Sequence, residues 1–272
     1  MQRTLCDGFE VEGIGLHSGQ RVVCEVLPAP EDSGFSFERI DCPGSPRIPA
    51  RWEWVKSGRM ATTLCKDGVE VSTVEHLLAA LYGMGVDNAH IRLTSREVPV
   101  CDGSALIWVE AIEQVGIVEQ DQARRVHSIV SEVVLSSGDR RIKASAADGL
   151  MMQVTVDFEH PMVGREDLAL ELSPSVFKRE IAWARTFGFE KDLVALRSMG
   201  LGLGGSLENA LVFGDDGVIN PDGLRGAKEV VRHKVLDLVG DLALAGCRIS
   251  GQLVVERPGH EFTHQFLKTI QP

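Results

Sequence analysis

One segment of the sequence divides the chain into two halves of the same kind. Residues 119–125 are polar and show no apolar periodicity, whereas the stretches on both sides alternate predicted strands with predicted helices. A polar segment in such a place is typical of a linker between domains. The 272 residues suffice for two domains of roughly 120 to 140 residues, each with its own core. We therefore expect domains at residues 1–124 and 125–272.

The hydrophobic pattern predicts strands and helices in both halves. In the first half it predicts strands at residues 21–27, 35–40 and 89–94, and helices at 73–81 and 105–115. In the second half it predicts strands at 129–135, 141–146, 150–158, 207–213 and 250–256, and helices at 193–199, 228–245 and 262–269. Ser72 and Glu75 form a capping-box pattern, which indicates a first helix that begins at Thr73. These elements predict an α+β fold.

The charge balance limits the partners that the chain can have. It carries 39 acidic and 28 basic residues, a net charge of −11, which opposes broad contact with nucleic acid or an anionic membrane. No apolar stretch reaches the roughly 18 residues of a membrane span, and the first residues lack a secretory signal. The six cysteines form no C-x-x-C pair, which is typical of free thiols. We expect a cytoplasmic protein in which an anionic ligand would need a local basic pocket.

The strongest indication of chemistry is a polar stripe on the predicted helix at residues 228–245. His233, Asp237 and Asp241 recur at every fourth position and therefore share one face of an otherwise apolar helix. An imidazole and a carboxylate at this spacing can bind one metal ion, and both are suitable ligands for zinc. The alternative is a polar helix face exposed to water. The spacing alone does not decide between the two.

A catalytic zinc site needs a third protein ligand, and the adjacent pair Glu75 and His76 can supply it. In such a pair one side chain can bind the metal while its neighbour faces the water to be activated. The alternative is that Glu75 serves only as a helix cap and that His76 is buried in the core. His260 follows a predicted strand in a turn and could donate a proton in a cleft. The glycine-rich segments at 13–19 and 200–206 match no phosphate-binding loop.

Six motifs along the chain, taken together, resemble the UDP-3-O-acyl-N-acetylglucosamine deacetylases of lipid A biosynthesis. They are Ser72-Thr-Val-Glu-His-Leu77, Asp102-Gly-Ser104, Ala184-Arg-Thr-Phe-Gly-Phe189, Gly204-Gly-Ser206, Val231-Arg-His-Lys-Val-Leu-Asp237 and Gly259-His260. The resemblance runs in order from Gly13 to Leu267, almost the whole chain. It implies an α+β fold of two similar domains, each a β-sheet layered with two helices. It also implies an active site in the cleft between them.

The resemblance implies a role for particular residues. It implies zinc ligands at His76, His233 and Asp237, with Fe²⁺ as the other possible native metal, and a general base at Glu75. It further implies that His260 is the acidic or electrostatic partner, oriented by Asp241, and that the Thr186 hydroxyl contacts the developing oxyanion. After Gly259-His260 the family commonly has a small or apolar residue and an asparagine, whereas this chain continues Glu261-Phe-Thr-His264.

The same resemblance implies a substrate and the residues that bind it. Lys234 would bind the substrate, and Phe187 would line the site near the sugar. Arg257 would contact the diphosphate, and Leu193, Leu203 and Ala210 the acyl chain. The implied reaction is hydrolysis of the N-acetyl group of a UDP-linked 3-O-(3-hydroxyacyl)-N-acetylglucosamine by a monomer, with release of acetate. Two alternatives stay open: a zinc amidohydrolase for another acylated amine, and a nucleotide-sugar-binding protein without turnover. Whether Glu75 alone moves both protons also stays open.

Overall fold

A five-stranded sheet forms the frame of the first half of the chain. The computed structural model describes residues 1–272. The strand order is β2-β3-β9-β4-β5, and only the β4 and β9 pair is parallel. Alternate residues of β3, among them Val22, Cys24 and Val26, are buried, so one face of the sheet belongs to the core. The strands are β2 (Phe9–Ile14), β3 (Arg21–Pro28), β9 (Ala89–Leu93), β4 (Phe35–Arg39) and β5 (Arg47–Pro49).

Two helices and two small sheets complete this half. Helix α1 (Glu75–Gly83) is buried along its whole length, whereas α2 (Leu106–Val115) buries one face through Trp108, Val109 and Ile112. A short 3₁₀ turn, η1 (Trp52–Trp54), precedes a three-stranded sheet of β6 (Val55–Ser57), β7 (Thr63–Lys66) and β8 (Val69–Ser72). Strand β1 (Arg3–Leu5) pairs with β10 (Ile117–Glu119). The chain then crosses to the second half.

A second, larger sheet forms the frame of the second half. Its path is β12-β13-β18-β14-β15, and β11 adds to it by pairing parallel with β18. The strands are β11 (Val126–Ser128), β12 (Val133–Ser137), β13 (Arg140–Ser145), β14 (Leu150–Phe158), β15 (Gly164–Glu171) and β18 (Arg248–Glu256). The helices are α3 (Pro174–Val176), a π-helical turn η2 (Phe177–Ile181), α5 (Glu229–Leu242) with its 3₁₀ extension η3 (Ala243–Ala245), and α6 (His260–Ile270). A separate projection carries β16 (Phe187–Phe189), α4 (Glu190–Ser198) and β17 (Leu211–Phe213).

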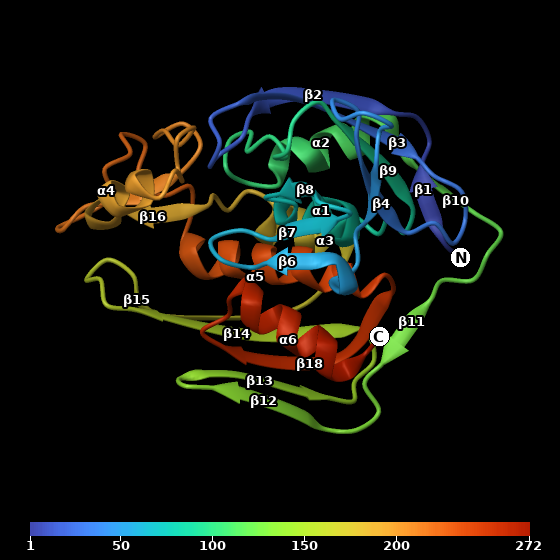
Figure 1. Ribbon diagram of the computed structural model, residues 1–272. Helices are drawn as coiled ribbons and strands as arrows, with labels where there is room; N and C mark the ends of the chain where they lie inside the picture. The colour runs from blue at the N-terminus through green and yellow to red at the C-terminus, as the bar shows by residue number, and fades with distance from the viewer.

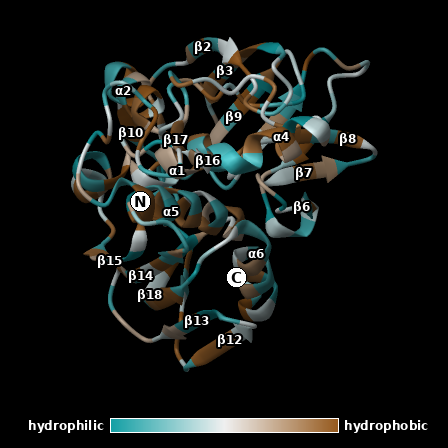
Figure 2. Ribbon diagram, turned by 90° about the vertical axis from the view of Figure 1, so that its left-hand side faces the viewer, coloured by the Kyte–Doolittle hydropathy of each residue, from teal (hydrophilic) through white to brown (hydrophobic).

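The two sheets lie on the outside, and helices of both halves fill the space between them. Figure 1 shows α1 and α5 in this middle layer, with the β16 and α4 projection extending to one side. The hydrophobic colouring of α2 and of much of α5 in Figure 2 agrees with their contribution to the core. Helices α1 and α5 approach each other at Gly240, where a Cβ atom would lie 2.1 Å from the carbonyl oxygen of Glu75. Only glycine permits this contact.

The structure corrects the predicted start of the first helix. Helix α1 begins at Glu75 rather than Thr73, and no side chain caps it. Thr73 has a φ of 56°, which takes it out of the helical path, and Ser72 is the last residue of β8. The capping-box prediction was therefore wrong. Freed from capping, the Glu75 carboxylate accepts a hydrogen bond from the backbone N–H of Thr62 at 3.1 Å.

Two predicted strands are shorter than expected. Of the strand predicted at residues 129–135 only the last three residues are extended, because β11 ends at Ser128, before the predicted start, and β12 begins at Val133. Of the strand predicted at 207–213 only β17 remains, since the side chain of Asn209 accepts a hydrogen bond from Ser206 N and closes a turn just before it.

Strand β15 was missed, because four charged or polar positions interrupt its apolar alternation. None of the helices combines the length and apolar character that crossing a membrane requires.

Candidate active site

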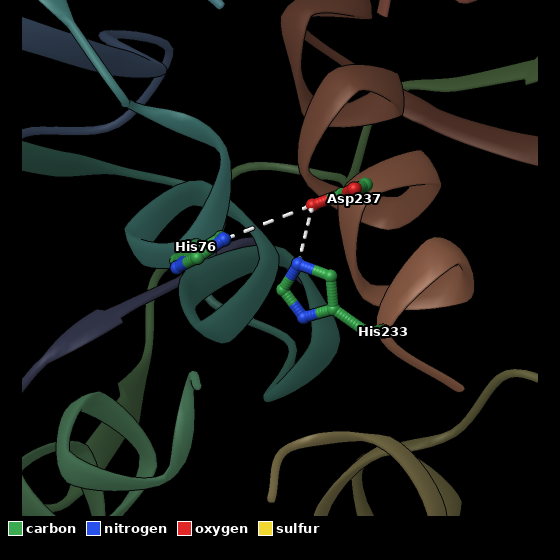
Figure 3. Close-up of side chains that lie close together, drawn as sticks. All are labelled: His76, His233 and Asp237. Carbon is green, nitrogen blue, oxygen red and sulfur yellow. Dashed lines mark ion pairs between the residues drawn. The ribbon is translucent and has the colours of Figure 1, made fainter. Parts of the chain in front are cut away.

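Three possible metal ligands meet where α1 faces α5. His76 comes from α1, and His233 and Asp237 come from α5, one turn apart. Their ligand atoms all lie within 4.8 Å of one another. Asp237 Oδ1 lies 3.3 Å from His233 Nε2 and 3.7 Å from His76 Nε2. Figure 3 shows both imidazoles directed toward this one carboxylate. All three side chains are buried, so the polar stripe of α5 is not an exposed helix face.

The protonation of these residues suits a cation. His233 Nδ1 donates a hydrogen bond to the carbonyl of Ala184 at 3.0 Å, which leaves the lone pair of Nε2 facing Asp237. Burial lowers the pKa of His233, and burial together with the neighbouring His233 lowers the pKa of His76 to about 3. The acceptor atoms of two neutral imidazoles and one carboxylate therefore face one another. This donor set fits a divalent metal with an open coordination position.

Asp237 stays ionised within this buried group. Burial would raise its pKa, but the ammonium group of Lys234, at 2.8 Å from Oδ2, and the surrounding histidines hold the pKa well below its usual range. Lys234 Nζ also lies 5.4 Å from the centre of the Phe187 ring. The positive charge of Lys234 thus lies near both the carboxylate of Asp237 and the aromatic ring of Phe187.

Glu75 is a buried carboxyl group beside the metal ligands. It immediately precedes His76, and its Oε1 lies 3.8 Å from His260 Nε2. Burial raises the pKa of Glu75 to about 7, and only the facing His260 opposes this strongly. A carboxyl group with a pKa near neutrality can both accept and release a proton at physiological pH.

Asp241 fixes His260 through a network that includes two unexpected residues. Its Oδ2 accepts a hydrogen bond from His260 Nδ1 at 2.8 Å, and its Oδ1 accepts one from the Thr62 hydroxyl at 2.6 Å. His264 Nε2 lies 3.3 Å from the same Oδ1 and 3.2 Å from Thr62 Oγ1. Burial would lower the pKa of His260, but Asp241 outweighs it and raises the pKa to about 10. His260 is therefore positively charged at neutral pH.

These groups open into one cavity of about 680 Å³. Thr186, Phe187, Lys234 and the three metal-ligand candidates line its polar end. Leu193 and Ala210, predicted to contact an acyl chain, also line the cavity, together with Leu196, Leu207, Val212 and Ile219. These apolar residues belong to the projection that carries β16, α4 and β17, which Figure 1 shows to one side of α1 and α5, and they form the apolar end of the cavity. Leu203 does not line the cavity and is 57% exposed. The prediction for Leu203 therefore has no support in the geometry.

Arg257 lies outside the cavity lining. Its guanidinium group forms ion pairs with Asp139 and, at 2.8 Å, with Asp157 Oδ2. Arg140 instead lines the cavity beside Gly259 and has no carboxylate within ion-pair distance. No pattern in the sequence indicated Arg140, Thr62 or His264, because none of them shares a motif with the residues it meets in the fold.

The fold and the site together define a metal-dependent hydrolase, in which a His-His-Asp group, a raised-pKa carboxyl group and a charged histidine share one cavity. The chain belongs to the LpxC family, whose description is UDP-3-O-acyl N-acetylglycosamine deacetylase and whose profile matches residues 2–271. A relative from Myxococcus xanthus (strain DK1622), named UDP-3-O-acyl-N-acetylglucosamine deacetylase, is 42% identical over 99% of this chain and 86% of its own. Relatives of the same name from Pseudomonas entomophila (strain L48) and Hahella chejuensis (strain KCTC 2396) are 41% and 42% identical, each over 99% of this chain and 89% and 90% of their own.

Proposed function

We propose that the protein hydrolyses the N-acetyl group of a UDP-3-O-acylated N-acetylglucosamine, an early step of lipid A biosynthesis, with release of acetate. One observation carries this proposal: the His76, His233 and Asp237 group lies beside Glu75 in a cavity that continues into an apolar end. The polar end suits an amide and a sugar, and the apolar end suits an acyl chain. The names of the relatives support the same substrate.

We propose zinc as the metal, held by His76 Nε2, His233 Nε2 and an oxygen of Asp237. Two imidazoles and one carboxylate are a common ligand set for catalytic zinc, and Fe²⁺ is the other candidate. When bound, the metal would polarise the amide carbonyl and lower the pKa of a water molecule. The three residues that would hold it lie on α1 and α5, and His76 directly follows Glu75, so this chemistry would take place beside that carboxyl group.

The protein's own groups supply the two proton transfers. Ionised Glu75 accepts a proton from the attacking water, and His260, charged at neutral pH, donates a proton to the departing amine. One water is consumed, the C–N bond breaks, and acetate and a free amine result. The Thr186 hydroxyl, at the polar end of the cavity, donates to the oxyanion that forms on the carbonyl oxygen. Asp241 holds His260 in place by accepting from its Nδ1.

For the diphosphate, the geometry favours Arg140 over Arg257. Arg140 lines the cavity and has no carboxylate partner, whereas two aspartates already neutralise Arg257. A free guanidinium group can bind a phosphate in two-point fashion. Phe187 and Lys234, which also line the cavity, would contact the sugar.

The acyl chain provides the test of this function. Each methylene that is buried contributes about 0.8 kcal/mol, so shortening the acyl chain by about four carbons should lower kcat/KM by roughly two hundredfold. Acetate and the free amine are measured by mass spectrometry. UDP-N-acetylglucosamine without an acyl chain should be a very poor substrate. Equal kcat/KM for acylated and unacylated substrates would refute the acyl site, and no acetate from any substrate would favour a binding protein.

A matched pair of variants locates the acyl chain. Ala210→Phe fills the apolar end of the cavity and should lower kcat/KM more for long acyl chains than for short ones. Val194→Phe places the same ring on α4 at a position that is 80% exposed, and it should leave the chain-length preference unchanged. If both variants behave alike, the apolar end of the cavity is ordinary core packing.

The protonation states predict a bell-shaped dependence of kcat/KM on pH. Activity should rise as Glu75 ionises, at or below about pH 7 because a bound cation favours the carboxylate, and should fall as His260 loses its proton near pH 10. Asp241→Asn removes the negative charge that raises the pKa of His260, so the fall should move to lower pH. If the basic limb keeps its position in Asp241→Asn, His260 is not the group that titrates there.

We also propose the division into domains at residues 1–124 and 125–272. It is supported by two main sheets that share no strand. A monomer is supported by a site whose residues all come from one chain. A cytoplasmic location is supported by six cysteines that are all free.

A further inference from the structure

A buried ion pair lies next to the metal ligands, and the mechanism does not use it. Arg185 and Glu229 have side chains that are only 6% and 0% exposed. Glu229 Oε1 accepts from Arg185 Nε at 2.8 Å and from the backbone N–H of Arg185 at 3.1 Å, and Oε2 accepts from Arg185 Nη2 at 3.2 Å. The ion pair is therefore bidentate, and Glu229 holds both the side chain and the backbone of Arg185.

This pair and a metal ligand connect the same two segments of chain. Glu229 and His233 are one turn apart on α5. Arg185 directly follows Ala184, whose carbonyl oxygen accepts the hydrogen bond from His233 Nδ1 at 3.0 Å. The ion pair and that hydrogen bond thus form two neighbouring links between α5 and residues 184–185. Movement of one link displaces the other.

The segment that carries the Ala184 carbonyl has no regular structure of its own. Residues 184–186 lie between the π-helical turn η2 and β16 and belong to neither. Beyond the links to α5, Thr186 donates from its backbone N–H to the carbonyl of Gly103 at 2.7 Å. Glu229 also accepts from the backbone N–H of Arg225 at 2.7 Å, and Arg185 Nη2 donates to the carbonyl of Gly223 at 2.8 Å. The ion pair therefore adds side-chain contacts to the backbone hydrogen bonds of this segment, which also run from Ala184 N–H to the carbonyl of Ile181 at 3.0 Å and from Leu211 N–H to the carbonyl of Thr186 at 2.8 Å.

We propose that Arg185 and Glu229 are positioning residues for the metal centre: their ion pair sets the Ala184 carbonyl, which orients the ring of His233, and holds Thr186 at the cavity. The inference rests on the proposed metal-dependent function. Groups that orient a metal-ligating histidine through its second nitrogen commonly change metal affinity by about 10- to 100-fold when they are removed. The same loss is expected here.

The test is the metal affinity of a double variant. A single substitution would leave an unpaired charge in the interior and could unfold the protein, whereas Arg185→Met with Glu229→Gln removes both charges at nearly constant volume. Zinc affinity is measured by competition with a chelator, and folding by circular dichroism and thermal melting. We expect a folded protein whose Kd for zinc is raised by about 10- to 100-fold. Arg185→Lys keeps the charge but not the bidentate contact, so its Kd for zinc should lie between those of the double variant and the parent.

A second ion pair provides the control. Arg39 is also buried, contacts Asp41 through two nitrogens at 2.8 and 2.7 Å, and lines no part of the cavity. Arg39→Met with Asp41→Asn should lower the melting temperature without changing zinc affinity. The inference would be overturned, and the proposed function left standing, by either of two results. One is equal zinc affinity in the parent and the Arg185/Glu229 variant, and the other is an equal loss of zinc affinity in the two double variants. A parent protein that binds no divalent metal would overturn the proposed function and the inference with it.

Discussion

Replacing Glu75 by glutamine is expected to lower kcat/KM by about a hundredfold to ten-thousandfold while the metal content stays the same. Glutamine keeps the size of the side chain and its acceptor oxygen for Thr62 N–H, but it cannot take a proton from water. The metal ligands His76, His233 and Asp237 are untouched by the change. Turnover and metal content, measured on the same preparation, separate loss of the base from loss of the metal.

A second glutamate serves as the control for this variant. Glu166 is also partly buried, has a pKa raised by burial, and accepts a hydrogen bond from Val231 N, but it lies outside the cavity lining. Glu166→Gln should keep nearly normal activity. If Glu75→Gln also kept near-normal activity, Glu75 would serve only as a structural hydrogen-bond acceptor for Thr62.

Removal of a metal ligand is expected to abolish metal binding and activity together. The parent protein should hold about one metal ion per chain, and both His76→Ala and His233→Ala should reduce this to near zero, because a catalytic site with three protein ligands retains the ion poorly with two. Metal content is measured by elemental analysis after dialysis, and activity by acetate release. Added zinc should restore neither variant at concentrations that saturate the parent protein.

The control for the ligand variants is a histidine with a carboxylate partner elsewhere. His90 Nε2 lies 2.8 Å from Glu38 Oε2 in the first sheet, and neither residue lines the cavity. His90→Ala should keep both metal and activity. Full metal occupancy in His76→Ala and His233→Ala would show that the ligands have been wrongly assigned.

The sequence predicted best what lies on a single element. His233 and Asp237 could be placed together because they share one helix face, and the structure has them one turn apart on α5. The α+β class and the family were also predicted, and both are confirmed. The approach of His76 to α5 depends on the packing of two helices far apart in sequence. The residues alone offered the Glu75 and His76 pair as one of two alternatives, and the resemblance to a family favoured it.

The predictions that failed, or that the geometry does not support, depended on neighbours that folding supplies. Ser72 matches a capping box, but the positive φ of Thr73 prevents the cap. Arg257 has the right charge for a diphosphate, yet Asp139, in the turn before β13, and Asp157, in β14, form ion pairs with it. His264 had no partner along the chain, whereas in the fold it meets Asp241 and Thr62. Local patterns contain no information on such long-range pairs.

The division of the metal ligands between α1 and α5 has a consequence for the order of events during synthesis. His76 leaves the ribosome long before His233 and Asp237, which are separated from it by more than half the chain. Until α5 packs against α1 at Gly240, the nascent protein holds no complete metal centre. In small zinc modules the ion organises the fold, because the ligands are close in sequence and the core is slight. Here the ligand candidates are far apart in sequence and the apolar core is large, so we expect the fold to form without the ion and the ion to bind afterwards.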